Sequence, residues 1–234
     1  PGDARPLSIV NTDNRLMANA VRLRVEPLLA KAVSPAQRGF LPGWSMLQNG
    51  FEIDGEMRAA SLQAEFPAAV FFDFAAAFPS LAHDFLRGIL DHLQLPRQFR
   101  AFVVNLYLGN GCRIASAGDN HDGFSVRSGI RQGCPLSPLL FALCGDLLLR
   151  RLQHLLPDDL CRAYADDIGL VAKDLFASAE TFVPIFEEFA EISGLSFNLS
   201  KTVFVPLGDT SVEEFRRELA ERFAGWGAAG VRGW

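Results

Sequence analysis

The sequence predicts an α+β fold, and three of its stretches carry that prediction. A continuous apolar run over residues 67–74 is typical of a strand buried on both faces. Two shorter apolar runs, on either side of residues 164–167, predict a β-hairpin with those four residues at its tip. The segment over residues 138–156 is apolar nearly all round, which predicts a central core helix.

Composition bounds the class of protein. With 234 residues, 49% of them hydrophobic, the chain is long enough for one large globular domain or two small ones. No apolar run reaches the roughly 18 uninterrupted residues that a membrane span needs, so we expect no membrane-embedded part. The first residues show neither an initiator methionine nor a signal pattern. We therefore expect a fragment of a longer reading frame with an intracellular location, either nuclear or cytoplasmic.

Charge and cysteine spacing narrow the class further. The net charge of −5 and the pI near 5.4 argue against a surface that binds nucleic acid all over. Most of the basic residues are nevertheless arginines, whose guanidinium group suits phosphate. The cysteines show no metal-site spacing with one another or with histidines, so we expect four reduced structural thiols: Cys112, Cys134, Cys144 and Cys161.

The N-terminal part of the chain is predicted to be mainly helical. Residues 5–10 are expected to be extended, and Asp13 should cap a helix whose apolar positions pack against the body: Leu16, Ala20, Leu23 and Leu28. A turn-rich linker over residues 37–43 separates this helix from a second one, which Ser45 caps and which runs to about Leu62.

The apolar strand over residues 67–74 carries one carboxylate, Asp73, to its end. Burying an unpaired carboxylate is costly, so we expect Asp73 at an edge of the sheet, beside a cation or a hydrogen-bond donor. After it the pattern predicts a helix capped by Ser80, a second helix over residues 97–108 and a hairpin over residues 112–127.

The C-terminal half is predicted to alternate helices with extended segments. A glycine-punctuated loop over residues 129–138 leads into the core helix, and its glycines permit close approach of the backbone. After the central hairpin we expect a helix over residues 178–193 and a strand pair over residues 196–206. A capping box formed by Ser211 and Glu214 should open the last helix.

The tip of the central hairpin carries two adjacent carboxylates, Asp166 and Asp167. Tight hairpin turns favour glycine or asparagine because the turn residues need a positive φ, so two aspartates there depart from the local rule and indicate function. The two carboxylates repel one another unless a cation lies between them, and their hard oxygen donors suit Mg²⁺. The alternative is a solvated acidic turn without a function.

Five stretches of the chain resemble the motifs of a reverse transcriptase of the kind encoded by non-LTR retrotransposons. In chain order they are residues 5–8, residues 72–74 with Phe78, residues 128–138, residues 164–167, and residues 193–198 with Lys201 and Thr202. The resemblance covers nearly all of residues 5–207. It implies the fingers and palm of a right-hand polymerase, with an antiparallel palm sheet backed by helices.

The resemblance also implies a domain organisation. The fingers would comprise roughly residues 1–66 and 95–128, and the palm roughly residues 67–94 and 129–207. Residues 208–234 would form a C-terminal helix and a frayed tail that leads towards a thumb outside this sequence. We expect the thumb, and an endonuclease, to be further domains of the parent polyprotein.

The activity that the resemblance implies is RNA-directed DNA polymerisation, in which dNTPs are added to the 3′-OH of a DNA primer on an RNA template. Such nucleotidyl transfer uses carboxylates that hold two Mg²⁺ ions about 3.5 to 4 Å apart, with Mn²⁺ as a substitute. The resemblance assigns catalysis to three residues, Asp73, Asp166 and Asp167, and metal contacts to these three and Phe74. It assigns nucleotide contacts to five more: Arg5, Phe78, Gln132, Gly133 and Lys201.

The sequence departs from the pattern of its relatives at four positions. Ala75, Ala76 and Pro79 stand where lysines and a second aspartate usually follow the first aspartate, and Trp44 stands where an arginine follows the Pro-Gly of the fingers. None of these positions is assigned a metal ligand. The departures therefore bear on how tightly the fingers hold nucleic acid.

Two other functions compete with this interpretation. One is an RNA-directed RNA polymerase or nucleotide cyclase on the same palm, which Phe78 argues against because its ring would fill the space of a ribose 2′-OH; a purely structural core ring is the alternative for Phe78. The other is a catalytically decayed copy or a non-catalytic scaffold. The retention of three aspartates argues against the scaffold, because a carboxylate cluster costs stability without its cation.

Overall fold

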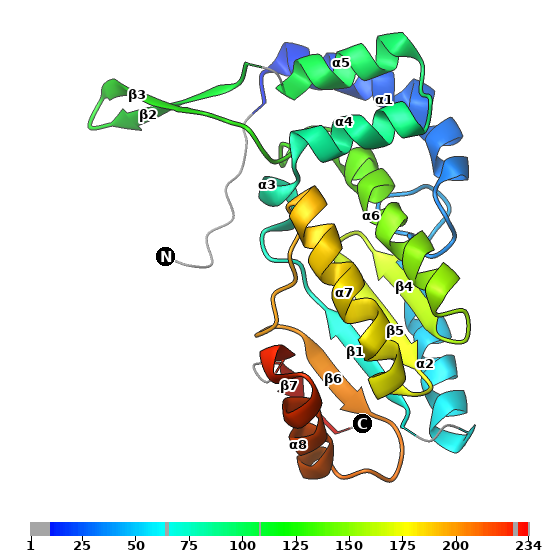
Figure 1. Ribbon diagram of the computed structural model, residues 1–234. Helices are drawn as coiled ribbons and strands as arrows, with labels where there is room; N and C mark the ends of the chain where they lie inside the picture. The colour runs from blue at the N-terminus through cyan, green and yellow to red at the C-terminus, as the bar shows by residue number, and fades with distance from the viewer. Residues whose placement is uncertain (1–9, 64–65, 108, 227–228, 234) are drawn as a thin grey trace.

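The computed structural model describes residues 10–63, 66–107, 109–226 and 229–233 (Figure 1). Its helices are α1 (Thr12–Ala32), α2 (Met46–Gln63), α3 (Ala77–Ser80), α4 (His83–His92), α5 (Arg97–Tyr107), α6 (Ser137–Leu155), α7 (Leu175–Ser193), α8 (Val212–Arg222) and the 3₁₀ turn η1 (Ala224–Trp226). Its strands are β1 (Ala68–Phe72), β2 (Gly111–Ser116), β3 (Asp119–Ser125), β4 (Leu160–Tyr164), β5 (Asp167–Ala172), β6 (Val203–Pro206) and β7 (Gly230–Val231). This mixture of helices and a mainly antiparallel sheet confirms the predicted α+β class.

The main sheet has five strands in the order β4-β5-β1-β6-β7, so the strand that ends next to Asp73 lies at its centre. Strands β4, β5, β1 and β6 are antiparallel to their neighbours, and β7 is parallel to β6. Successive side chains of a strand point to opposite faces of its sheet. In β1, Val70 and Phe72 belong to the main hydrophobic core, whereas Ala69 packs in a smaller cluster on the other face with Met57 of α2.

Helices cover both faces of this sheet (Figure 1). On the main core face, the Phe72 ring meets two rings of α7, Phe182 at 5.7 Å and Phe186 at 4.9 Å between centroids. Helix α6 contacts both β4 and α7 and buries nearly every residue from 137 to 149, as its all-round apolar pattern predicts. The residues described include no helix with the length and apolarity required to span a bilayer.

Several predicted element boundaries are wrong, and backbone hydrogen bonding explains two of them. Ser80 does not cap a helix; it ends α3, and α4 begins only at His83. The intervening residues are held extended because the carbonyl of Leu81 accepts the N–H of Gly129 and the N–H of Ala82 donates to the carbonyl of Ser193. Over residues 196–206 only β6 forms, since residues 198–202 are a hydrogen-bonded turn.

Helix α1 is rotated relative to the prediction. The residues expected to pack are exposed, namely Leu16, Ala20, Leu23 and Leu28, while Ala18 and Leu29 are buried. The buried pair faces the body because α1 contacts α6. The helix itself is present as predicted. The apolar residues used to predict it, however, do not lie on the side that packs against the body.

The C-terminal tail is ordered where the structure describes it, in contrast to the frayed tail expected from its glycines and alanines. Trp226 is buried against Phe182 and Phe204, with ring centroids 5.9 Å away in both cases. Beyond it, β7 joins the sheet and the N–H of Gly230 donates to the carbonyl of Thr202. Burial of one large aromatic side chain outweighs the flexibility of the tail.

Candidate active site

The hairpin of β4 and β5 has a two-residue loop, Ala165 and Asp166, closed by the pair Tyr164 and Asp167. The positive φ that such a loop needs is carried by Ala165, at 61°, and not by either aspartate. The expectation that the aspartates themselves break the turn rule is therefore wrong. Asp166 stands in the loop, and Asp167 is the first residue of β5.

Asp73 lies beside this hairpin tip. The last pair between β1 and β5 is Phe72 with Ile168, and continuing this register by one residue would set Asp73 opposite Asp167. Side chains opposite one another in antiparallel strands lie on the same face, with Cβ atoms about 4.5 to 5.5 Å apart. Asp73 and Asp167 accordingly line the same open cavity, of ≈ 530 Å³, together with Lys201. Asp166 is not among the residues that line it.

Lys201 reaches Asp73 from the turn that precedes β6. Its Nζ lies 3.7 Å from Oδ2 of Asp73, and the two side chains are 59% and 33% exposed. The turn is tied to the same strand end, because the N–H of Asn198 donates to the carbonyl of Asp73 at 2.7 Å and the N–H of Lys201 donates to the carbonyl of Asn198 at 3.0 Å. The cation expected beside Asp73 is thus present as a lysine ammonium group.

A second group of predicted residues lies around α3. The Phe78 ring stacks on Phe141 of α6 at 5.1 Å and meets the ring of Phe40 edge-on at 6.2 Å. The carbonyl of Phe78 accepts the N–H of Ile130, which brings the loop with Gln132 and Gly133 next to α3. Gln132 is partly exposed, Gly133 is exposed and has a φ of 101°.

Two further predicted residues have no side-chain role visible here. Phe74 is buried and its ring stacks on Phe197 at 4.3 Å, so only its main chain could contact a metal. Arg5 lies outside the described residues.

Trp44, one of the departures from the family pattern, packs under the guanidinium group of Arg38, whose Cζ lies 4.7 Å from the centre of the indole ring.

Sequence reasoning missed a buried contact between the presumed linker and the hairpin tip. The Gln37 side chain is 1% exposed and holds the main chain of Ala165 on both sides: Nε2 donates to the Ala165 carbonyl at 3.1 Å, and Oε1 accepts the Ala165 N–H at 3.0 Å. Oε1 also accepts the N–H of Gly39 at 2.8 Å. We call these three hydrogen bonds the Gln37 clamp. The glycine after Arg38 was the one sequence signal, because it permits close backbone approach.

An ion-pair network ties the same region together. Glu52 of α2 accepts hydrogen bonds from Arg38, at 2.8 and 2.9 Å, and from Arg162 of β4, at 2.6 Å. Burial by itself raises the pKa of Glu52, but the hydrogen bonds from Arg162 and Arg38 outweigh it and lower the pKa below the ordinary value. We call this network the Glu52 bridge.

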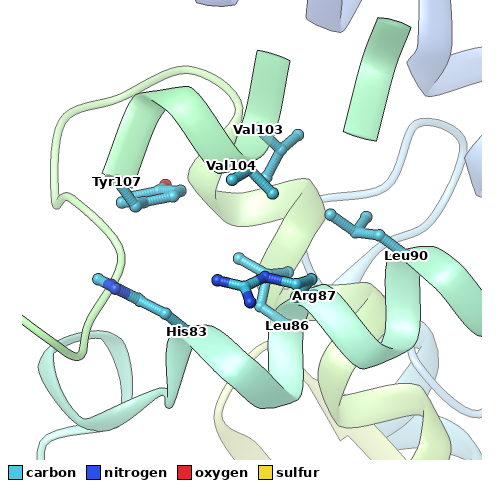
Figure 2. A pocket seen from close by; sticks show the side chains of 7 residues that line it. All are labelled: His83, Leu86, Arg87, Leu90, Val103, Val104 and Tyr107. Atoms are coloured by element: carbon cyan, nitrogen blue, oxygen red, sulfur yellow. The ribbon is translucent and has the colours of Figure 1, made fainter. Parts of the chain in front are cut away.

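Another cavity, between α4 and α5, is unrelated to the carboxylates (Figure 2). Its volume of ≈ 30 Å³ has room for about one water molecule and none for a nucleotide. Burial raises the pKa of Tyr107 at its rim to about 12, and the Tyr107 hydroxyl pairs with that of Ser137 at 3.2 Å. The residues that line this cavity are His83, Leu86, Arg87, Leu90, Val103, Val104 and Tyr107.

The carboxylates at the hairpin tip and at the neighbouring strand end are of the chemical type that binds a divalent cation, and they come from adjacent strands. Carboxylate oxygens are the ligands that Mg²⁺ prefers, and one of them, on Asp73, lies 3.7 Å from the ammonium group of Lys201. The side chains do not converge fully, since nowhere in the described part of the chain do three His, Cys, Asp or Glu side chains form a group able to hold a metal.

A carboxylate at the end of a central antiparallel strand, with two more at the tip of the adjacent hairpin, defines the palm class of nucleic-acid polymerases. The family model described as reverse transcriptase (RNA-dependent DNA polymerase) matches residues 1–216. The chain belongs to this family.

Similar proteins agree with this assignment. A transposon TX1 uncharacterized 149 kDa protein from Xenopus laevis is 31% identical over 218 residues, which are 89% of this chain and 17% of that protein. The Pol polyprotein from the type-2 retrotransposable element R2DM of Drosophila melanogaster is 29% identical over 86% of this chain and 19% of its own length. The chain thus spans less than a fifth of the length of these relatives.

Solved structures share the fold. The apo telomerase of Candida tropicalis truncated from its C-terminal domain superposes with a TM-score of 0.63 at 15% identity, over 83% of this chain and 41% of that one. A telomerase of Candida albicans in complex with a TWJ fragment of telomeric RNA gives a TM-score of 0.57 at 15% identity, over 86% of this chain and 34% of that one. At such identities the likeness shows the fold alone.

Proposed function

We propose that this chain is the core of an RNA-directed DNA polymerase that adds deoxynucleotides to the 3′-OH of a DNA primer on an RNA template. The observation that supports this most is the register of the palm sheet, which, continued by one residue, would set Asp73 opposite Asp167 at the tip of the carboxylate hairpin. Family membership and the RNA-bound telomerase neighbours support a nucleic-acid template.

In this proposal Asp73, Asp166 and Asp167 would hold two Mg²⁺ ions, and the main-chain carbonyl of Phe74 would be a further ligand at the same strand end. The ions, when bound, lower the pKa of the primer hydroxyl and stabilise the leaving pyrophosphate. With a cation at Asp73, Lys201 would be free to contact the phosphate of the leaving group. Its 3.7 Å contact and largely exposed side chain are compatible with that change of partner.

The remaining residues position the nucleotide. Phe78, Gln132 and Gly133 form one face of its site, with the Phe78 ring beside the sugar and Arg5 directed at the triphosphate. Residues 1–66 and 95–128 correspond to fingers and residues 67–94 and 129–207 to palm. The thumb and an endonuclease belong to the longer polyprotein, of which this chain is a part.

Primer extension tests the proposal. Asp73→Asn and Asp166→Asn should each abolish RNA-templated extension with Mg²⁺ while the protein stays folded by circular dichroism, because each removes a shared metal ligand. Asp167→Asn should reduce extension less. Asp158→Asn is the matched control, since Asp158 is an exposed carboxylate at the far end of the same hairpin.

Two results would count against the proposal. Equal extension by the wild type and Asp166→Asn would overturn the metal assignment. No extension by a folded wild type with either Mg²⁺ or Mn²⁺, in the 234-residue chain and in the chain fused to a thumb, would favour the non-catalytic scaffold.

A further inference from the structure

The Gln37 clamp holds the one residue of the hairpin tip whose backbone is under strain. Ala165 has a φ of 61°, in the left-handed region that alanine adopts at a cost and glycine adopts freely. Two-residue hairpin loops usually have glycine or asparagine at such a position. Here the conformation is fixed from outside, because a primary amide satisfies both the N–H and the carbonyl of Ala165.

The clamp is built to be rigid. The main chain around Gln37 docks on the outer edge of β4: the N–H of Arg38 donates to the Ala163 carbonyl at 3.0 Å, and the N–H of Ala163 donates to the Ala36 carbonyl at 2.7 Å. At Gly39 any Cβ would come within 1.9 Å of the Ala165 nitrogen. The amide of Gln37 is therefore held at the tip by backbone contacts that do not depend on its own side chain.

We propose that Gln37 is a positioning residue, which fixes the direction of Asp166 and Asp167 by holding Ala165 in its left-handed conformation. This inference rests on the proposed function, in which those two aspartates hold the metal ions. Ala165 immediately precedes them, so a change in its φ and ψ swings both carboxylates relative to Asp73. Partners behind a metal ligand typically contribute about 10- to 100-fold to metal affinity or activity.

The test replaces Gln37 by methionine, which keeps the length and volume of the side chain but makes none of the three hydrogen bonds. Ser34→Ala is the matched control: it lies in the same segment and loses a buried side-chain hydrogen bond, from Ser34 Oγ to Asp146 Oδ1 at 2.5 Å, that does not touch the hairpin. Gln37→Glu is a second variant: it keeps an acceptor for the Ala165 N–H but places a buried carboxylate oxygen against the Ala165 carbonyl, so it should disrupt the clamp at neutral pH as well.

Three readouts separate positioning from simple stability. In Gln37→Met the amide hydrogen of Ala165 should exchange with solvent at least about tenfold faster than in Ser34→Ala, measured by NMR at equal distance from each melting temperature. The Mg²⁺ concentration that gives half of the maximal thermal shift should rise roughly tenfold or more. In primer extension kcat should fall while the KM for the primer–template stays the same.

Rescue makes the proposal specific. Ala165→Gly, which takes a positive φ without strain, should restore much of the Mg²⁺ response and of kcat in the Gln37→Met background and change little by itself. The proposal is overturned if Gln37→Met and Gln37→Glu match Ser34→Ala in both amide exchange and Mg²⁺ response. A wild type that binds Mg²⁺ yet extends no primer would contradict the proposed function instead, and the exchange data would still decide on the clamp.

Discussion

Phe78 is held by two rings, and this packing defines what its replacement should do. One face stacks on Phe141 and an edge meets Phe40, so the side chain is only partly buried and part of its ring remains accessible. In the proposed function such a ring would both pack against the core and line the sugar site.

We predict that Phe78→Val admits ribonucleotides. Filling the space of a 2′-OH with a ring costs a ribonucleotide on the order of 1 to 3 kcal/mol, which corresponds to about tenfold to a hundredfold discrimination. The measurement compares dNTP and rNTP incorporation on one RNA template for the wild type and the variant. Phe85→Val is the control, because Phe85 is also partly buried and meets one ring, Phe189, at 5.6 Å. If both variants lose stability and neither changes sugar choice, Phe78 is a core residue only.

The sequence could predict the carboxylates but not what holds them. Asp166 and Asp167 stand out because they are adjacent in an apolar hairpin, and Asp73 because it ends a buried strand. Gln37 gives no such local signal, since its partner Ala165 lies 128 positions away. The sequence also does not indicate that Ala165 has the positive φ. Composition alone does not show which two residues of the hairpin tip form the loop.

At the scale of elements, the Glu52 bridge joins three parts of the fold through one carboxylate: Glu52 lies on α2, Arg38 follows Gln37, and Arg162 lies on β4. Removing the carboxylate leaves Arg38, whose side chain is 4% exposed, without its acidic partner. Loss of one member of a buried charge pair is usually more harmful than loss of an exposed one.

We predict that Glu52→Gln destabilises the protein in a pH-dependent way. The pKa of Glu52 is lowered in the folded state, so its contribution is fully present above the ordinary value of 4.5 and is lost as pH falls through the lowered pKa. The free energy of unfolding of wild type and variant should therefore differ by a constant amount from pH 6 to 8 and converge below about pH 4.5. Urea titrations across this range measure it.

Glu188→Gln is the control for this prediction. Glu188 pairs with a single arginine, Arg151 at 2.7 Å, and both side chains are about half exposed; ion pairs as exposed as this contribute little to stability. If the loss in free energy of unfolding depends on pH in Glu188→Gln as it does in Glu52→Gln, then removing any paired glutamate has this effect. The Glu52 bridge would then contribute no more to stability than an exposed ion pair.

The elements themselves were predicted unevenly, for physical reasons. The core helix, the central hairpin and the capping of α8 by Ser211 follow from local patterns and are confirmed. The side of α1 that packs and the order of the C-terminal tail depend on contacts with α6 and with the aromatic core around Trp226. Local periodicity carries no information about such partners.

For the whole molecule, we predict that Mg²⁺ stabilises the fold by ligand linkage. A ligand that binds only the folded state at ten times its Kd adds about 1.4 kcal/mol to the free energy of unfolding, which for a chain of this size raises Tm by about 3 to 6 °C. The relief of repulsion among Asp73, Asp166 and Asp167 adds in the same direction. Differential scanning fluorimetry with increasing Mg²⁺ measures the shift.

The variant with all three aspartates changed to asparagine is the reference for that shift. Its Tm without Mg²⁺ should be equal to or above that of the wild type, and it should not respond to Mg²⁺. A wild type whose melting curve is independent of Mg²⁺, and which extends no primer, would favour the scaffold.

The hairpin of β2 and β3 extends away from the body (Figure 1), and nearly all of its residues are exposed. A two-stranded ribbon that buries no apolar face of its own is marginally stable, and its turn, Ala117 and Gly118, has positive φ at both residues. We therefore expect the turn to accept an inserted domain, because exposed loop tips tolerate insertions where a packed strand does not.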